Sequence, residues 1–185
     1  MGPDIIYTGH LVLKVENESK AKDVLNLYQR NRLLFERFEP TRPSDFYTLD
    51  YHYNMLRREY RAYLAGTFIR YYIYEAYHMT RIIGAVNFNL FFHSQKPYAE
   101  IGYKIDSLHQ NRGYAYEACM AGIKIVSQEY GITNFHARIL PDNLPSRHLA
   151  GKMGFTPVCT EPLSANVCGR MVDIIRYILD TSQIQ

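Results

Sequence analysis

The residues best suited to do chemistry stand in one short segment, Gln110–Ala115, which reads Gln-Asn-Arg-Gly-Tyr-Ala. A predicted strand ends and a predicted helix begins here, so the first backbone N–H groups of the helix have no partner within it. These donors and the positive end of the helix dipole favour a bound anion. Gly113 permits close approach of a phosphate, Ala115 keeps the first turn slim, and Arg112 can add charge-assisted hydrogen bonds. An ordinary strand-to-helix turn with a flexible glycine is the competing interpretation.

Three further polar residues lie close to this segment in the predicted order of elements. Glu100 belongs to the strand before it, and Asn143 and Ser146 stand at the start of a short helix after the following strand. Glu100 can act as a general base, or it can anchor an ammonium group or serve a structural role. Asn143 can also be explained as a turn-forming residue before a helix, and Ser146 as a cap or first-turn hydroxyl.

Composition excludes several classes of protein. The 185 residues are 47% hydrophobic and 21% charged, which excludes a disordered chain and fits one compact domain over residues 1–185. A net charge of +3 is too small to indicate a duplex-binding protein. This charge is as compatible with a small anionic ligand as with nucleic acid. No segment has the pattern of a signal peptide or the apolar length of a membrane span. The cysteines, Cys119, Cys159 and Cys168, lack metal-ligand spacing, so we expect reduced thiols, no metal, no membrane partner and a cytoplasmic protein.

The elements that must position these residues alternate between the two periodicities of secondary structure. Alternating apolar residues predict strands at His10–Val15, Phe68–Tyr74, Val86–Leu90, Ala99–Ile105, Phe135–Ile139, 155–158 and 171–179. The last two of these strands are expected to form a hairpin around a loop rich in small residues. Spacings of three and four predict helices after caps at Ser19 and Ser44, over Ala115–Gly131 and over Pro145–Met153. The order β-α-α-β-β-β-α-β-α-β-β predicts a mixed α/β layered domain.

The motifs in this order resemble those of the GNAT superfamily of acetyl-CoA-dependent N-acetyltransferases. Gln110–Ala115 is similar to the family's pyrophosphate-binding Q/R-x-x-G-x-G/A motif. The subgroup that includes the ribosomal-protein N-terminal (RimJ/RimL-like) acetyltransferases has an N-x-x-S segment followed by K-x-G-F, which Asn143–Ser146 and Lys152–Phe155 resemble. That subgroup's A-E-(I/L)-G-Y strand and opening strand resemble Tyr98–Tyr103 and Thr8–Val15. The resemblance is specific over residues 82–157 and weak over residues 16–80.

The resemblance implies a fold and a cofactor. The fold is a mixed, mostly antiparallel sheet with helices on both faces and two splayed central parallel strands, here Ala99–Ile105 and Asn134–Ile139. Acetyl-CoA lies between these strands as co-substrate. Asn143 would hydrogen-bond its pantetheine arm, and its pyrophosphate would rest on Gln110, Asn111, Arg112, Gly113, Tyr114 and Ala115.

The resemblance also implies a mechanism, in which a neutral primary amine attacks the thioester directly in a ternary complex. The acceptor is a peptide or protein N-terminal α-amine or a small-molecule amine, and no nucleic acid is expected. Glu100 is the candidate base. Many members place a tyrosine acid seven residues after the asparagine, where this chain has Ala150, so Ser146, facing the sulfur end, is the substitute. In this superfamily the last strands commonly pair between the subunits of a homodimer.

Two alternatives stay open at this stage. The missing tyrosine at position 150 motivates a non-catalytic acyl-CoA-binding or sensing module. Single-stranded nucleic-acid binding rests only on the modest positive charge and on Tyr71, Tyr72 and Tyr74. The 17 tyrosines of the chain add a hypothesis about the acceptor, that Tyr47 and Tyr51 line an aromatic cleft. Two minor expectations are that Asp173 orients the loop at Gly169, and that a predicted helix buries the tyrosines Tyr53, Tyr60 and Tyr63.

Overall fold

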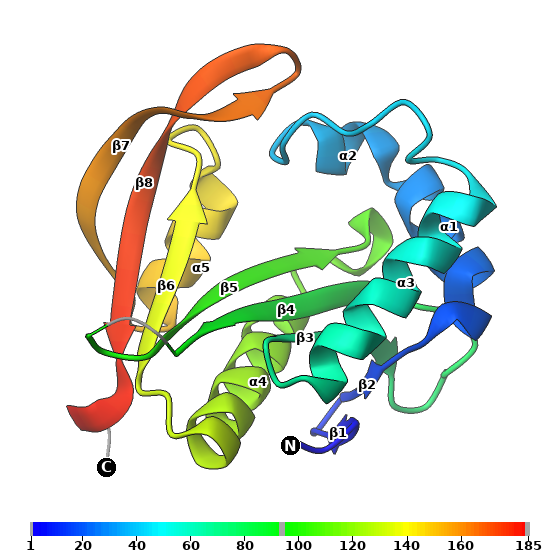
Figure 1. Ribbon diagram of the computed structural model, residues 1–185, viewed down its shortest axis with the longest axis horizontal. Helices are drawn as coiled ribbons and strands as arrows, with labels where there is room; N and C mark the ends of the chain where they lie inside the picture. Colours follow the sequence, from blue (N-terminus) through cyan, green and yellow to red (C-terminus); the bar gives the residue numbers. More distant parts are fainter. Residues whose placement is uncertain (1, 93–94, 184–185) are drawn as a thin grey trace.

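The computed structural model describes residues 2–92 and 95–183, whose strands form one eight-stranded sheet of order β1-β2-β3-β4-β5-β6-β8-β7 (Figure 1). Neighbouring strands are antiparallel except β5 and β6, which are parallel, so the predicted mixed sheet is confirmed. The strands are β1 (Ile5–Tyr7), β2 (Leu11–Val15), β3 (Phe68–Glu75), β4 (Gly84–Phe91), β5 (Tyr98–Ile105), β6 (Asn134–Ile139), β7 (Thr156–Val167) and β8 (Arg170–Asp180).

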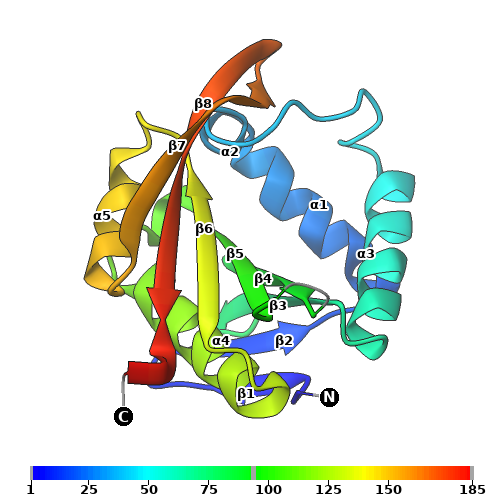
Figure 2. The same ribbon diagram turned by 60° about the vertical axis from the view of Figure 1, so that its left-hand side comes forward.

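Helices cover both faces of this sheet, as predicted (Figures 1 and 2). One face carries α1 (Ala21–Arg30) and α3 (Leu49–Leu64), with the short α2 (Arg32–Glu36) beyond them, and the other carries α4 (Tyr114–Tyr130) and α5 (Leu144–Lys152). Single 3-10 turns complete the order: η1 (Glu18–Lys20), η2 (Ser107–His109) and η3 (Thr181–Gln183). No helix in the described part of the chain is long and apolar enough to cross a membrane.

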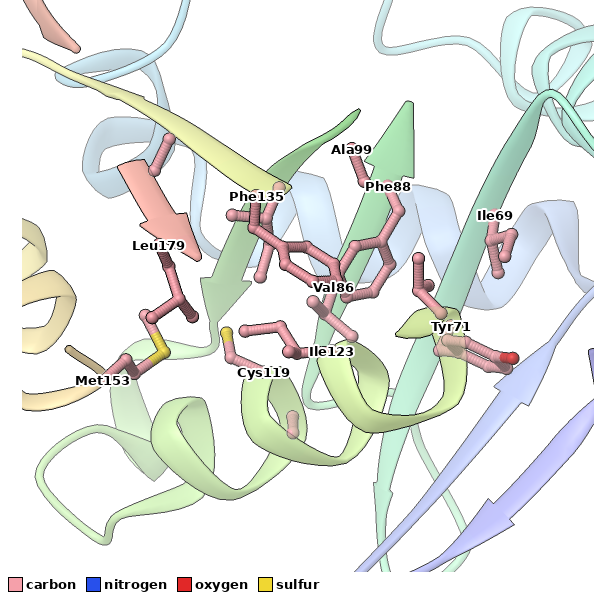
Figure 3. Packing of buried hydrophobic residues seen from close by; sticks show 14 of the residues in the cluster. Ile69, Tyr71, Val86, Phe88, Ala99, Cys119, Ile123, Phe135, Met153 and Leu179 are labelled. Atoms are coloured by element: carbon pink, nitrogen blue, oxygen red, sulfur yellow. The ribbon is translucent and has the colours of Figure 1, made fainter. Parts of the chain in front are cut away.

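Helix α4 packs unusually close to the sheet because of one glycine. A Cβ at Gly122 would lie 2.6 Å from ring atoms of Phe88, a distance that real Cβ atoms essentially never show. The Phe88 ring meets Phe135 edge-on with centroids 6.4 Å apart, and both lie over Cys119 and Ile123 of α4 (Figure 3). Such aromatic pairs add stability beyond their buried area, so this cluster fixes the helix whose start forms the predicted anion site.

The two parallel strands separate partway along their length. Their register pairs run only from Tyr98↔Asn134 to Glu100↔His136, whereas β5 stays paired with β4 as far as Ile105↔Gly84. Beyond Glu100 the edge of β5 that faces β6 therefore has no strand partner, and Figure 1 shows the two strands running apart. The predicted splay is confirmed.

Several local predictions were incomplete or wrong. Neither β1 nor α2 was predicted, and α3 is capped by Thr48, whose Oγ1 accepts from the Tyr51 N–H at 3.2 Å, rather than by Ser44. Tyr53 is 43% exposed because it follows the fully buried His52 and so lies about 100° around α3 from it, at the margin of the buried face.

The small-residue loop expected near the C-terminus is part of a strand. Strand β7 continues to Val167 through a register shift between Glu161 and Ala165, within which Leu163 has φ +47°. Asp173 supports this irregularity, because its Oδ1 accepts from the Leu163 N–H at 2.9 Å. This hydrogen bond is made to β7 rather than to the loop at Gly169, which corrects the expectation for Asp173.

Candidate active site

A cleft of about 850 Å³ opens where β5 and β6 separate. One end contains the start of α4 and the start of α5. The other end is bounded by α2 with the loop that follows it and by the β7–β8 hairpin. Its lining includes most of the residues singled out from the sequence: Glu100, Gln110, Asn111, Gly113, Tyr114, Ala115, Asn143 and Ser146.

The start of α4 has the geometry of an anion site. Gly113 has φ +80° and Asn111 φ +61°, so the backbone turns sharply before Tyr114 begins the helix. A Cβ at Gly113 would meet no protein atom within 4 Å, so the space beside this backbone is open. With the free N–H groups of the helix start, this arrangement fits a phosphate group of a nucleotide cofactor.

Arg112 lies apart from the other residues of the predicted anion site. Its side chain is 52% exposed, does not belong to the described lining of the cleft, and lies with Nη1 3.4 Å from Oε1 of Glu75. The guanidinium is therefore paired with Glu75 in this structure, and its contact with a pyrophosphate stays a prediction.

Asn143 and Ser146 stand together at the start of α5. The Asn143 Oδ1 accepts from the Ser146 N–H at 3.2 Å, so Asn143 caps α5, in agreement with the structural role considered for it above. Both residues also line the cleft. Ala150 is fully buried in the core and brings no hydroxyl to the cleft.

Tyr103 is a cleft residue that the sequence reasoning did not select. Its hydroxyl donates to the Ser146 carbonyl at 3.2 Å, and burial raises the pKa of Tyr103 well above its usual range, so the hydroxyl stays neutral. The alternation of β5 was a signal for it, because Tyr103 falls on the same face as Ala99 and Ile101, which bury against α4.

Glu100 occupies the last position at which β5 pairs with β6, and its pKa is shifted upward. Burial is the largest effect and raises the pKa of Glu100. The charge of Glu161 also raises this pKa, whereas Arg138 and Arg176 lower it, and the net shift is upward. Both arginines are paired with Glu161, Arg138 through Nη2 at 3.0 Å, so much of their positive charge is offset. A half-buried carboxylate with a raised pKa is suited to accept a proton near neutral pH.

The opposite end of the cleft is built by residues that the sequence did not reveal. Phe35 and Phe38 line it, together with Glu39 and Lys104, whose Oε1 and Nζ lie 2.7 Å apart. Burial would raise the pKa of Glu39, but Lys104 and Arg42 lower it, so this carboxylate is ionised and already paired.

The tyrosines proposed for this end do not line it. In the described residues, the cleft lining contains neither Tyr47 nor Tyr51, and both pack on Phe46 with ring centroids 5.1 and 4.9 Å from it. Both rings are instead partly buried against a second core cluster, and a role for them in acceptor binding stays a prediction.

A clasp of three hydrogen bonds covers this end of the cleft. The Thr41 N–H donates to the Asn166 carbonyl at 2.8 Å, the Thr41 hydroxyl donates to Asn166 Oδ1 at 2.9 Å, and the Gly169 N–H donates to Thr41 Oγ1 at 3.1 Å. The loop after α2 thereby joins the tip of the β7–β8 hairpin, as the closeness of α2 and the hairpin in Figure 2 indicates. The cleft lies beneath it, because Pro40, Ala165 and Val167 are among its lining residues.

Candidate metal ligands are scattered. Within residues 2–92 and 95–183, no group of three or more His, Cys, Asp or Glu side chains is arranged to hold a metal ion.

Solved structures of similar fold cover nearly the whole chain. The ribosomal-protein-S5-alanine acetyltransferase from Vibrio fischeri superposes with a TM-score of 0.89 at 19% sequence identity over 98% of each chain. RimJ of Mycobacterium smegmatis, solved with CoA-disulfide, superposes with a TM-score of 0.86 at 17% identity over 94% of this chain and 83% of that one. At these identities the likeness establishes the fold.

The sequence comparisons establish the family. Probable N-acetyltransferase YjcK of Bacillus subtilis (strain 168) is 28% identical over 142 residues, which are 73% of this chain and 74% of that protein. The family model described as the acetyltransferase (GNAT) domain matches residues 10–156. With that match, and with a cleft between splayed strands beside an open helix start, this chain belongs to the GNAT acetyltransferases.

Proposed function

We propose that this protein transfers the acetyl group of acetyl-CoA to a primary amine, by direct attack of the amine in a ternary complex. The observation that carries the proposal is the cleft between β5 and β6, which joins an anion site at one end to a half-buried carboxylate, Glu100, in its middle.

Acetyl-CoA supplies an activated thioester carbonyl, and this chain supplies its binding site. The loop Gln110–Ala115 binds the pyrophosphate through backbone N–H groups and the positive end of the α4 dipole. The unpaired edge of β5 beyond Glu100 hydrogen-bonds the pantetheine arm as an added strand would. Asn143 uses its Oδ1 as a cap, which leaves its amide nitrogen to donate to the same arm.

Positioning and charge stabilisation perform most of the catalytic work. The cleft holds the amine next to the carbonyl, and a backbone N–H on the free edge of β5 stabilises the developing oxyanion. Glu100 takes the proton of the attacking amine, directly or through water. Ser146 and Tyr103 lie at the sulfur end, and a thiol with a pKa of about 8.5 departs as a thiolate without a strong acid.

An N-terminal α-amine of a peptide or protein is the acceptor that asks least of this base. With a pKa of about 8, roughly a tenth of an α-amine is neutral at pH 7, against about 0.04% of a lysine amine. Because the clasp between Thr41 and Asn166 covers this end of the cleft, we expect the acceptor to be a slender group such as a chain end or a small-molecule amine. The Vibrio fischeri neighbour, a ribosomal-protein-S5-alanine acetyltransferase, is consistent with this acceptor class.

Thiol release from acetyl-CoA over a panel of amines tests the proposal. The panel contains peptides with a free N-terminus, the same peptides acetylated at the N-terminus but carrying one lysine, polyamines and amino-sugar antibiotics. We expect release with free α-amine peptides or a small primary amine, and little with the blocked peptides. A protein that binds CoA by calorimetry but acetylates no amine of the panel would instead be an acyl-CoA-binding module.

A further inference from the structure

The carboxylate of Glu75 contacts three side chains from the short segment around the anion site. Glu75 is the last residue of β3 and is held by its register pair with Leu11 of β2. Its Oε1 accepts from the Tyr114 hydroxyl at 3.1 Å and lies 3.4 Å from Arg112 Nη1. Its Oε2 lies 3.6 Å from Nε2 of His109. One side chain of a rigid strand thus reaches both ends of the loop between η2 and α4.

The backbone of this loop needs such support. Residues 110–113 lie between η2 and α4 and belong to neither, and Asn111 and Gly113 both have positive φ values, of +61° and +80°. Glycine adopts this conformation freely and asparagine tolerates it better than other residues, but four residues outside any helix or strand hold one shape only where contacts with their surroundings fix it.

His109 fixes the other end of the segment. Its ring is 7% exposed and stands between two carboxylates, with Nε2 3.6 Å from Glu75 and Nδ1 3.6 Å from Asp106. Asp106 is itself held by Arg30. The loop is thereby tied to β3 and to α1.

The negative charge of Glu75 indicates whether this residue contacts the cofactor or positions the loop that does. In the described part of the chain, His109 and Tyr114 line the cleft and Glu75 does not. A carboxylate in contact with a pyrophosphate would repel it, whereas one behind the loop is offset by Arg112 and hydrogen-bonded to Tyr114. We infer that Glu75 is a positioning residue that holds the loop in the shape that binds acetyl-CoA, an inference that rests on the proposed function.

Calorimetry with CoA tests this role without any acceptor. Glu75→Ala frees Tyr114 and Arg112 and is expected to weaken CoA binding about tenfold or more, the equivalent of one charge-assisted hydrogen bond. Glu75→Gln keeps an acceptor for the Tyr114 hydroxyl and loses only the charge, so a smaller loss of about threefold is expected. In the Tyr114→Phe background, Glu75→Ala should cost less than in the natural chain, because the shared hydrogen bond is already gone.

Glu16 offers a matched control. Its carboxylate also accepts from a tyrosine hydroxyl, that of Tyr74 at 2.8 Å, and lies 3.8 Å from the Lys14 ammonium, but it is outside the described lining of the cleft. Glu16→Ala should therefore leave CoA affinity within about twofold of the natural chain.

Steady-state kinetics separate positioning from general damage to the fold. Glu75→Ala should raise KM for acetyl-CoA while kcat at saturating acetyl-CoA and KM for the amine change less than about twofold. An unchanged CoA affinity in Glu75→Ala overturns the role of Glu75, as does an equal loss in Glu16→Ala. If Glu75→Ala does not fold, Glu75→Gln decides, and CoA affinity equal to that of the natural chain overturns the inference. Failure of the natural chain to bind CoA contradicts the proposed function instead.

Discussion

Gly113 and Gly131 stand at the two ends of α4, and both have a left-handed backbone conformation. Their φ values are +80° and +65°, and a Cβ at either would meet no protein atom within 4 Å. Alanine at either position therefore costs only the strain of a left-handed residue, about 1–2 kcal/mol. The free energy of unfolding without ligand should fall by this amount, and by nearly equal amounts, in Gly113→Ala and Gly131→Ala.

CoA binding should separate the two variants. Only Gly113 lines the cleft, so only its new methyl group enters the space beside the loop amides. If that methyl group displaces the pyrophosphate from one amide, the lost charge-assisted hydrogen bond of about 1.5–3 kcal/mol corresponds to roughly a 10- to 150-fold rise in Kd. Gly131→Ala should leave Kd unchanged.

Urea unfolding and calorimetry on the two variants and the natural chain give both quantities. Because the stability losses match, a difference in Kd between the variants reports only the space beside residue 113. Equal CoA affinities for Gly113→Ala and Gly131→Ala would refute the placement of the pyrophosphate on this loop. The bulkier Gly113→Val should abolish measurable binding.

Three further predictions concern the rest of the cleft and the core. Glu100→Gln should lower kcat/KM by about 10²–10⁴ if Glu100 is the base, and a loss under about threefold would assign it a structural role. Phe38→Ala should raise the KM of the acceptor, whereas Tyr51→Ala, which lies outside the described cleft lining, should not; the reverse result would support the tyrosine hypothesis. Burial lowers the pKa of His52 from 6.5 to about 4, so the folded protein favours the neutral ring. This contribution to the free energy of unfolding is fully present above about pH 6.5 and is lost as the pH falls through 4. His52→Phe should remove on the order of 3 kcal/mol of this pH dependence in unfolding experiments, and equal pH dependence in both chains would contradict it.

The parts of the fold that the sequence predicted are those with a strong local period. The central strands and α4 carry regular alternation or helical spacing, and Gly113 and Gly131 mark the ends of α4 in the sequence itself. Beyond the predicted residues 155–158, strand β7 has no such signal, because Pro162 and the irregularity at Leu163 interrupt its alternation. Asp173 of the neighbouring strand supports this irregularity. Its existence depends on pairing with β8, which a local pattern does not contain.

The same distinction separates the two ends of the cleft. The loop Gln110–Ala115 is one continuous segment, so its residue types and order indicate its chemistry. Glu75 contributes to it from a distant strand, and no spacing in the sequence points to that contact. Ser146 and Tyr103 meet in the same way, from α5 and β5.

The end of the cleft where we propose that the acceptor binds depends on such long-range contacts. Thr41 meets Asn166 across 125 residues of sequence, and Glu39 meets Lys104 from another element. A family that shares one cofactor must keep the cofactor loop similar, whereas each acceptor requires its own walls. If the amine enters at this end, as we propose, discrimination between acceptors should depend on how the loop after α2 and the tip of the β7–β8 hairpin fit together, since residues of both segments line the cleft there.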